Sequence, residues 1–126
     1  MLIHSWIENN FQRLVEIRRW LHQHPEVGFN EHETSKYCQD YMKDLGFEIH
    51  QTEPMKTGFY CNYGNGNGPT FAVRCDLDAL PIQEINTVDY CSVNSGVSHA
   101  CGHDAHLANI LGLATYIIET EQTIPG

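Results

Sequence analysis

The sequence predicts an α/β protein in which helices flank a small sheet. Two segments with helical periodicity come first, three segments with strand character follow, and a third helical segment closes the sequence. Strands flanked by helices form a layered α/β sandwich, because each layer buries its apolar face against the next. The length of 126 residues is that of one domain, which we assign to residues 1–126.

The first helix is predicted over residues 6–22. Its apolar residues recur at helical spacing and are Ile7, Phe11, Leu14 and Leu21. Ser5 and Glu8 form a capping-box pattern, in which the Ser side chain accepts the Glu amide proton and the Glu side chain reaches back. His24 and Pro25 mark the end of the helix.

Two further helices are predicted on the same grounds. One begins near residues 30–33 and ends at Gly46, a residue typical of a helix C-terminus. The other begins at His103 and ends before Pro125. Its buried stripe consists of Leu107, Ile110, Leu111, Ala114, Ile117 and Ile118.

Three strands are predicted between the second and third helices. Residues 47–51 alternate between apolar and polar, residues 58–63 form a second strand, and residues 70–74 are apolar enough to lie centrally in a sheet. Gly and Asn in residues 64–69 indicate a turn, because both tolerate positive φ. Residues 76–98 are predicted to be a long loop, and loops of this length in compact domains are usually functional.

Composition and charge argue against several classes of protein. With 16 acidic and 7 basic residues the net charge is −9, so binding to nucleic acid or to an anionic membrane is not expected. No apolar run approaches the roughly 20 residues of a membrane helix, and a signal-peptide pattern is missing at the start. The five Cys residues show no CxxC spacing, so reduced thiols are expected rather than a disulfide framework. A cytoplasmic location is predicted.

The densest chemical cluster is residues 98–106, which contain three His, one Cys and one Asp. Cys101 and His103 can face one cation if the chain turns at the Gly between them. A thiolate and an imidazole suit zinc, manganese, cobalt or nickel. The alternative is a set of polar residues at a helix start, with Asp104 as a cap. For any single residue we prefer that alternative, and for the whole cluster we favour a metal site.

A second cluster follows the predicted strand 70–74. Asp76 and Asp78 lie where ligand sites of α/β sheets are found, at the carboxyl end of a strand. Their carboxylates could hold a metal or orient an imidazole, and a turn with Asp residues as caps explains the segment alone equally well. On a fold that also presents Cys101 and His103, the functional interpretation is favoured.

A third segment, residues 19–31, is rich in His and acidic residues around Pro25. From the residues alone it is interpreted as a helix end followed by a loop. Glu26 and Glu31 are then expected to be solvated.

Together and in this order, the three segments resemble the zinc-dependent aminoacylase/carboxypeptidase superfamily (peptidase family M20) in its amidohydrolase branch. This branch includes hippurate hydrolases, N-acyl-amino-acid amidohydrolases and plant auxin-conjugate hydrolases. The most specific element is HACGHDAH at residues 99–106. The others are RRWLHQHPE at residues 18–26, residues 31–34, DLDALP at residues 76–81 and the pair Gln83-Glu84.

The resemblance implies the N-terminal part of a three-layer α/β/α metallopeptidase-like catalytic domain that holds two divalent metals. Cys101 matches the thiolate that bridges the metals, and His103 matches an imidazole ligand. Asp78 matches a carboxylate that orients the metal site and is the catalytic residue assigned within this chain. Asp76 stands where relatives outside the branch have a His ligand, so it is not assigned as one.

Full-length members add a Glu-Glu pair that supplies the general base, two more His ligands and a lid or dimerisation domain. None of these is contained in residues 1–126. The implied reaction is metal-dependent hydrolysis of the amide of a small N-acyl amino acid or peptide-like substrate, by a parent that is a homo-oligomer. The chain alone is expected to be inactive, and a non-catalytic truncated product or a metal-binding or interaction module stays open as the alternative.

Overall fold

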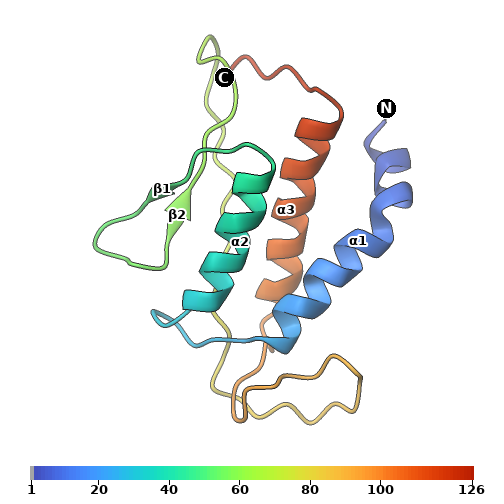
Figure 1. The fold of residues 1–126 in the computed structure, drawn as a ribbon, viewed down its shortest axis with the longest axis vertical. Coiled ribbons are helices and arrows are strands. Elements are labelled where there is room, and N and C mark those ends of the chain that lie inside the picture. The colour runs from blue at the N-terminus through green and yellow to red at the C-terminus, as the bar shows by residue number, and fades with distance from the viewer. Residues whose placement is uncertain (1) are drawn as a thin grey trace.

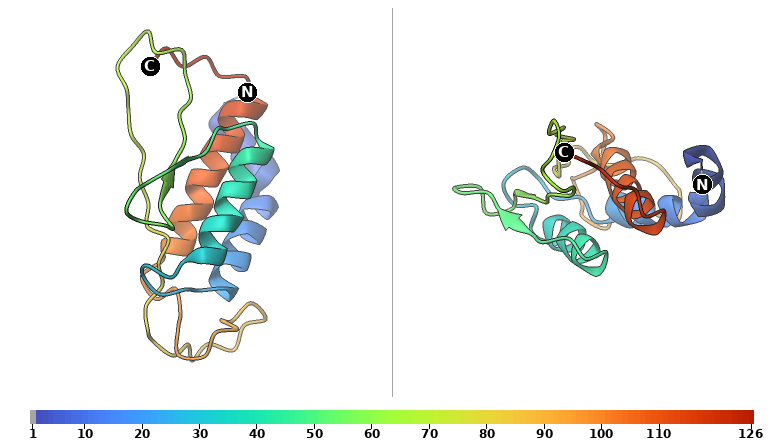
Figure 2. Two further views of the ribbon diagram at one scale, coloured as in Figure 1. Left: turned by 60° about the vertical axis from the view of Figure 1, so that its left-hand side comes forward. Right: turned by 90° about the horizontal axis from the view of Figure 1, so that it is seen from above.

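The computed structural model describes residues 2–126 as a layer of helices with an extended chain along one side (Figures 1 and 2). Helix α3 lies between α1 and α2 and packs against both. In chain order the elements are α1 (Ile3–Gln23), α2 (His32–Asp44), β1 (His50–Gln51), β2 (Phe59–Tyr60) and α3 (His103–Glu119). The three predicted helices are therefore confirmed, with small shifts at their ends.

The hydrophobic core lies where α3 meets the other two helices. It comprises Ile17, Leu21, Cys38, Met42, Leu107, Ala108, Leu111 and Ala114. Each helix contributes residues from the apolar stripe that its periodicity predicts. Helices α1 and α3 approach closely at Gly112, where a Cβ atom would lie only 2.6 Å from Leu14 Cδ2.

Helix α1 begins earlier than the capping-box pattern predicts. Its N-cap is Leu2, with no side-chain hydrogen bond, so the assignment of Ser5 as a cap is wrong. The reason lies in Trp6, which is buried and donates its indole N–H to Glu119 Oε2 at 2.9 Å. This contact fastens the first turn of α1 to the end of α3.

The sheet is smaller than predicted. β1 and β2 are antiparallel, with His50 opposite Tyr60 and Gln51 opposite Phe59, and both lie within predicted strands. Residues 70–74 do not form the predicted central strand: Phe71 and Val73 are 83% and 65% exposed. A strand is stabilised by a hydrogen-bonded neighbour, and no segment of residues 2–126 pairs with this one.

The long loop over residues 76–98 is confirmed, and short contacts fold it against the end of the helix layer (Figure 1). Ala79 N donates to Glu26 O at 2.7 Å, which makes an isolated parallel bridge with residues 26–27. Leu80 and Ser98 exchange two backbone hydrogen bonds of 3.0 Å. Both ends of the loop are therefore fixed close to the start of α3. Within residues 2–126, no helix combines the length and apolar character that a membrane span requires.

The position of the core gives a direct prediction. Leu21 is fully buried, so Leu21→Ala should lower the free energy of unfolding by about 2–5 kcal/mol through lost burial and a cavity. The matched control Phe11→Ala, on the exposed side of α1, should change it by less than about 0.5 kcal/mol. Urea unfolding followed by far-UV circular dichroism measures both. Equal losses of unfolding free energy in the two variants would contradict this position of the core.

Candidate metal centre

The candidate site lies where the long loop turns into α3. Gly102 is the N-cap of α3 with φ +87°, in the left-handed region that favours glycine. This turn carries the chain from Cys101 into the first helical residue, His103, as the sequence predicts. No side chain caps the start of α3, so the alternative role of Asp104 as a helix cap is wrong.

The imidazole of His103 has one nitrogen fixed and one left available. Its Nδ1 lies 2.8 Å from Asp78 O and 3.1 Å from Asp78 Oδ1. Because a carbonyl oxygen only accepts, Nδ1 carries a proton, and in the neutral imidazole Nε2 then keeps its lone pair. Nε2 is then the nitrogen that can bind a metal, with its orientation fixed by the hydrogen bond on the other side of the ring. The expected contact between Asp78 and the imidazole of His103 is present.

Asp76 lies on the opposite side of the same ring. Its Oδ2 is 3.7 Å from His103 Nε2, and Arg74 Nη1 donates to that oxygen at 2.9 Å. Asp76 and Asp78 are both partly buried, and they follow an extended, unpaired segment rather than the predicted central strand. The two carboxylates therefore flank the two nitrogens of His103.

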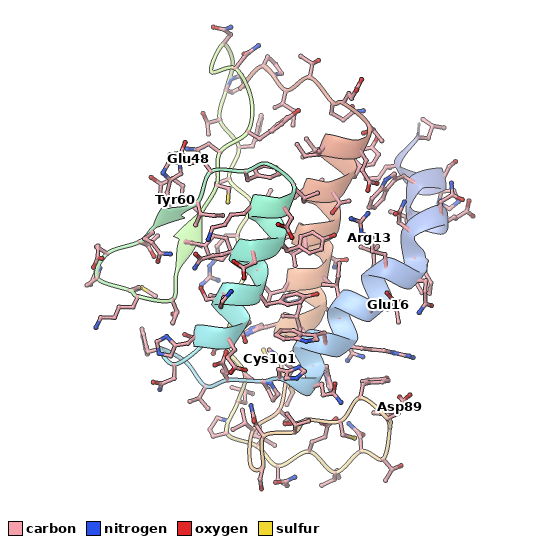
Figure 3. All side chains as sticks on the ribbon, viewed as in Figure 1. Arg13, Glu16, Glu48, Tyr60, Asp89 and Cys101 are labelled. Atoms are coloured by element: carbon pink, nitrogen blue, oxygen red, sulfur yellow. The ribbon has the colours of Figure 1, made fainter. Side chains whose placement is uncertain are left out.

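Cys101 presents an exposed free thiol two residues before His103, at the end of the helix layer (Figure 3). One thiolate and one imidazole nitrogen suit a borderline-soft divalent metal such as zinc. Within residues 2–126, no three His, Cys, Asp or Glu groups lie close enough together to hold a metal ion. The donor types fit such a metal, and the described residues alone do not complete its coordination.

Glu31 is buried and Glu26 is only partly exposed, whereas the residues alone predict that both are solvated. The Glu26 carboxylate accepts the backbone N–H groups of Glu33 at 3.1 Å and Thr34 at 2.7 Å. Glu31 is buried and accepts the N–H of Phe29 and the hydroxyl of Thr57. The first N–H groups of a helix lack intrahelical partners, and a carboxylate near them is favourable. The short spacing between Glu26 and α2 was the signal available for this cap.

The loop over residues 24–31 also contacts the segment that contains Asp76 and Asp78. Gly28 packs against Asp78, with a Cβ there at ordinary van der Waals distance, 3.9 Å, from Asp78 Oδ2. The Ala79 N–H bond to Glu26 O fixes the adjoining residue. Residues 24–31 therefore link the start of α2 to the backbone that orients His103.

A largely buried network of four titratable side chains lies behind the site. Asp104 Oδ2 is 2.8 Å from Arg18 Nε and 2.8 Å from His22 Nδ1. His22 Nε2 is 2.8 Å from Glu84 Oε1. Burial alone raises the pKa of Glu84, but hydrogen bonds from Ser92 N, the Asn86 amide and His22 outweigh it and lower the pKa to about 2. Sequence reasoning missed this network, because its members are 62 and 82 positions apart.

His99 is also buried, and neither ring nitrogen has a hydrogen-bond partner among the described residues. Burial lowers the pKa of His99; the attraction of Asp104 opposes this, and His22 and His103 lower it further. His99 is therefore held in the neutral form beside the charged network.

The lowered pKa of Glu84 makes its stabilisation depend on pH. The stabilisation is present above the unfolded value of 4.5 and is lost as the pH falls through the folded value of about 2. The free energy of unfolding of wild type minus that of Glu84→Gln should therefore be constant above about pH 5 and smaller at pH 3. Urea unfolding at both pH values measures it, with Glu48→Gln, at an exposed position, as the control. A difference that is the same at both pH values would contradict the assignment.

Residues 72–126 match the model of peptidase family M20/M25/M40. The chain is 40% identical over 116 residues to N-acetyl-L-cysteine deacetylase of Bacillus subtilis, covering 91% of this chain and 28% of that protein. It is 41% identical over 114 residues to N-acyl-L-amino acid amidohydrolase of Geobacillus stearothermophilus, covering 90% and 30%.

Among solved structures, a dinuclear metal-binding peptidase of the M20 family from Bacillus subtilis superposes with a TM-score of 0.82. Its sequence is 39% identical, and the match covers 90% of this chain and 32% of that one. The chain thus spans between 28% and 32% of the length of these relatives. The superposition confirms the predicted fold class, part of an α/β metallopeptidase-like catalytic domain. Residues 72–126 therefore match peptidase family M20, and the motif at residues 99–106, the fold and these relatives agree with that match.

Proposed function

We propose that this chain is the N-terminal portion of the catalytic domain of a metal-dependent amidohydrolase. The observation that carries the proposal is the imidazole of His103, whose Nδ1 is bonded to Asp78 O so that Nε2 can bind a metal, two residues after the exposed thiol of Cys101. The substrate class is a small N-acyl amino acid or peptide-like amide. The names of two relatives support this class, since one is an N-acetyl-L-cysteine deacetylase and the other an N-acyl-L-amino acid amidohydrolase.

Each of the three residues has a separate part in this proposal. Cys101 binds as a thiolate, which the positive end of the α3 dipole favours. His103 binds through Nε2. Asp78 holds the imidazole in the required tautomer and orientation, as partners of metal-bound His residues do. The proposed metals are two divalent ions among zinc, manganese, cobalt and nickel. When bound, they would polarise the amide carbonyl and make a water molecule more acidic.

The remaining parts of the proposed site belong to the parent protein outside residues 1–126. Among the described residues, no three His, Cys, Asp or Glu side chains lie close enough together to hold a metal ion. We assign the general base, the other ligands and a lid or dimerisation domain to the remaining length that the relatives have and this chain does not span. The parent is proposed to be a homo-oligomer in the cytoplasm, where the free cysteines stay reduced.

The second candidate function is a non-catalytic interaction module. It is favoured by residues 70–74, an extended segment with exposed Phe71 and Val73 and no paired neighbour among the described residues. An open, apolar edge of this kind pairs readily with another chain. Sedimentation of the purified chain, with and without Val73→Lys, tests this role: a monomer in both cases would contradict it.

Metal binding should depend on Cys101 and Asp78 to different extents. Cys101→Ser should abolish stoichiometric zinc binding, whereas Asp78→Asn, which keeps both oxygen acceptors and removes only the carboxylate charge beside the imidazole, should weaken the affinity by about 10-fold or less. Competition with a chromophoric chelator measures both affinities. Cys91→Ser and Asp89→Asn, in the loop, are the matched controls and should leave the affinity unchanged. Unaltered binding in Cys101→Ser would contradict the role of the thiolate.

The 126 residues alone should hydrolyse no amide, even in excess zinc or manganese. Loss of the general base costs on the order of 10²–10⁴ in rate, and the incomplete ligand set costs more. Assays with N-acetyl and N-benzoyl amino acids test this. Metal-dependent turnover that disappears in Cys101→Ser would overturn the assignment of the base to the absent part of the protein.

A further inference from the structure

We propose that His22 is a positioning residue for the metal centre, because its imidazole clamps the long loop to the first turn of α3. The clamp rests on the packing described above. Its effect on metal affinity rests on the proposed function. His22 lies near the end of α1 and touches neither Cys101 nor His103 in any contact given by the structure, so it acts through other residues.

Both ring nitrogens of His22 face carboxylates. Nδ1 is 2.8 Å from Asp104 Oδ2, and Nε2 is 2.8 Å from Glu84 Oε1. Carboxylate oxygens accept, so a ring nitrogen that carries a proton donates to the carboxylate that it faces. The His22, Asp104 and Glu84 side chains are 9%, 1% and 5% exposed, so these charge-assisted bonds are shielded from water.

The clamp joins the three segments that carry the family resemblance. His22 comes from residues 18–26, Glu84 follows the DLDALP segment, and Asp104 adjoins His103 in the third. Glu84 in turn accepts from Ser92 N at 2.6 Å and from the Asn86 amide at 3.0 Å. One imidazole therefore links α1, the fold of residues 84–92 and the start of α3.

The other groups around His22 reinforce the same arrangement. Arg18 donates to Asp104 through Nε at 2.8 Å, and its Nη2 lies 3.3 Å from His22 Nδ1. The Tyr90 ring of the loop packs edge-on against His22 and lies under Arg18 and Arg19, whose Cζ atoms are 5.4 and 4.6 Å from its centroid. The ring of the neutral His99 lies 6.5 Å away.

Glutamine does not reproduce both contacts of this imidazole. Glutamine has one donor group and one acceptor, so His22→Gln sets a carbonyl oxygen against one of the two carboxylates. A buried charge left without its partner is strongly destabilising. The first turn of α3 is then joined to α1 through Arg18 alone and loses its link to the long loop through His22, so His103 is held less firmly.

The test compares His22→Gln, Glu84→Gln and the control His32→Gln, an exposed residue on α2. Amide hydrogen exchange of the metal-free chain should be at least about 10-fold faster over residues 84–98 and 103–106 in His22→Gln. Its Zn²⁺ affinity, measured with Zn²⁺ alone, should fall about 10- to 100-fold. Glu84→Gln should accelerate exchange over residues 84–98, and His32→Gln should match wild type in both measurements.

The outcomes separate this inference from the proposed function. Wild type that binds no Zn²⁺, or binds it independently of Cys101, removes the proposed metal site, and the exchange measurements still decide on the clamp. Unchanged exchange in His22→Gln overturns the clamp, and faster exchange with unchanged Zn²⁺ affinity overturns the positioning role. If His22→Gln loses its helical circular dichroism, the variant Glu84→Gln tests the clamp in its place, because it retains the bond between His22 and Asp104. Unchanged exchange over residues 84–98 in that variant overturns the inference.

Discussion

The buried carboxylate of Asp104 is the constraint on which the site depends. It lies in the first turn of α3 with 1% of its side chain exposed, and a buried charge must be paired. Arg18 and His22 supply that pairing from α1 at 2.8 Å each. The pairing fixes the register between α1 and α3, and with it the place where His103 begins the helix.

Backbone groups also hold His103, the candidate metal ligand, in place. His103 Nδ1 meets the carbonyl of Asp78, and the neighbouring Ala79 is bonded to Glu26 O. Glu26 also caps α2 with its carboxylate. The ligand is therefore positioned by contacts that reach all three helices, so its geometry is set by the fold rather than by a flexible loop.

Periodicity predicted the three helices and the long loop, because each depends on residues close together in the sequence. The contact between Asp78 and His103 followed from the family motif. The cap at Ser5 was wrong because Trp6 fastens an earlier turn to α3, which no local pattern reveals. The strand at residues 70–74 needs a neighbour that residues 2–126 do not provide. The partners of His22 were beyond prediction, since they are far away in the sequence.

The central claim is that Cys101 and His103 bind one metal together. X-ray absorption at the zinc edge, on the chain loaded with one equivalent of Zn²⁺, tests it most directly. We expect a sulfur ligand at about 2.3 Å from the zinc and a nitrogen ligand at about 2.0–2.1 Å, with the sulfur lost in Cys101→Ser. A spectrum of the wild-type chain with only nitrogen and oxygen ligands would contradict it.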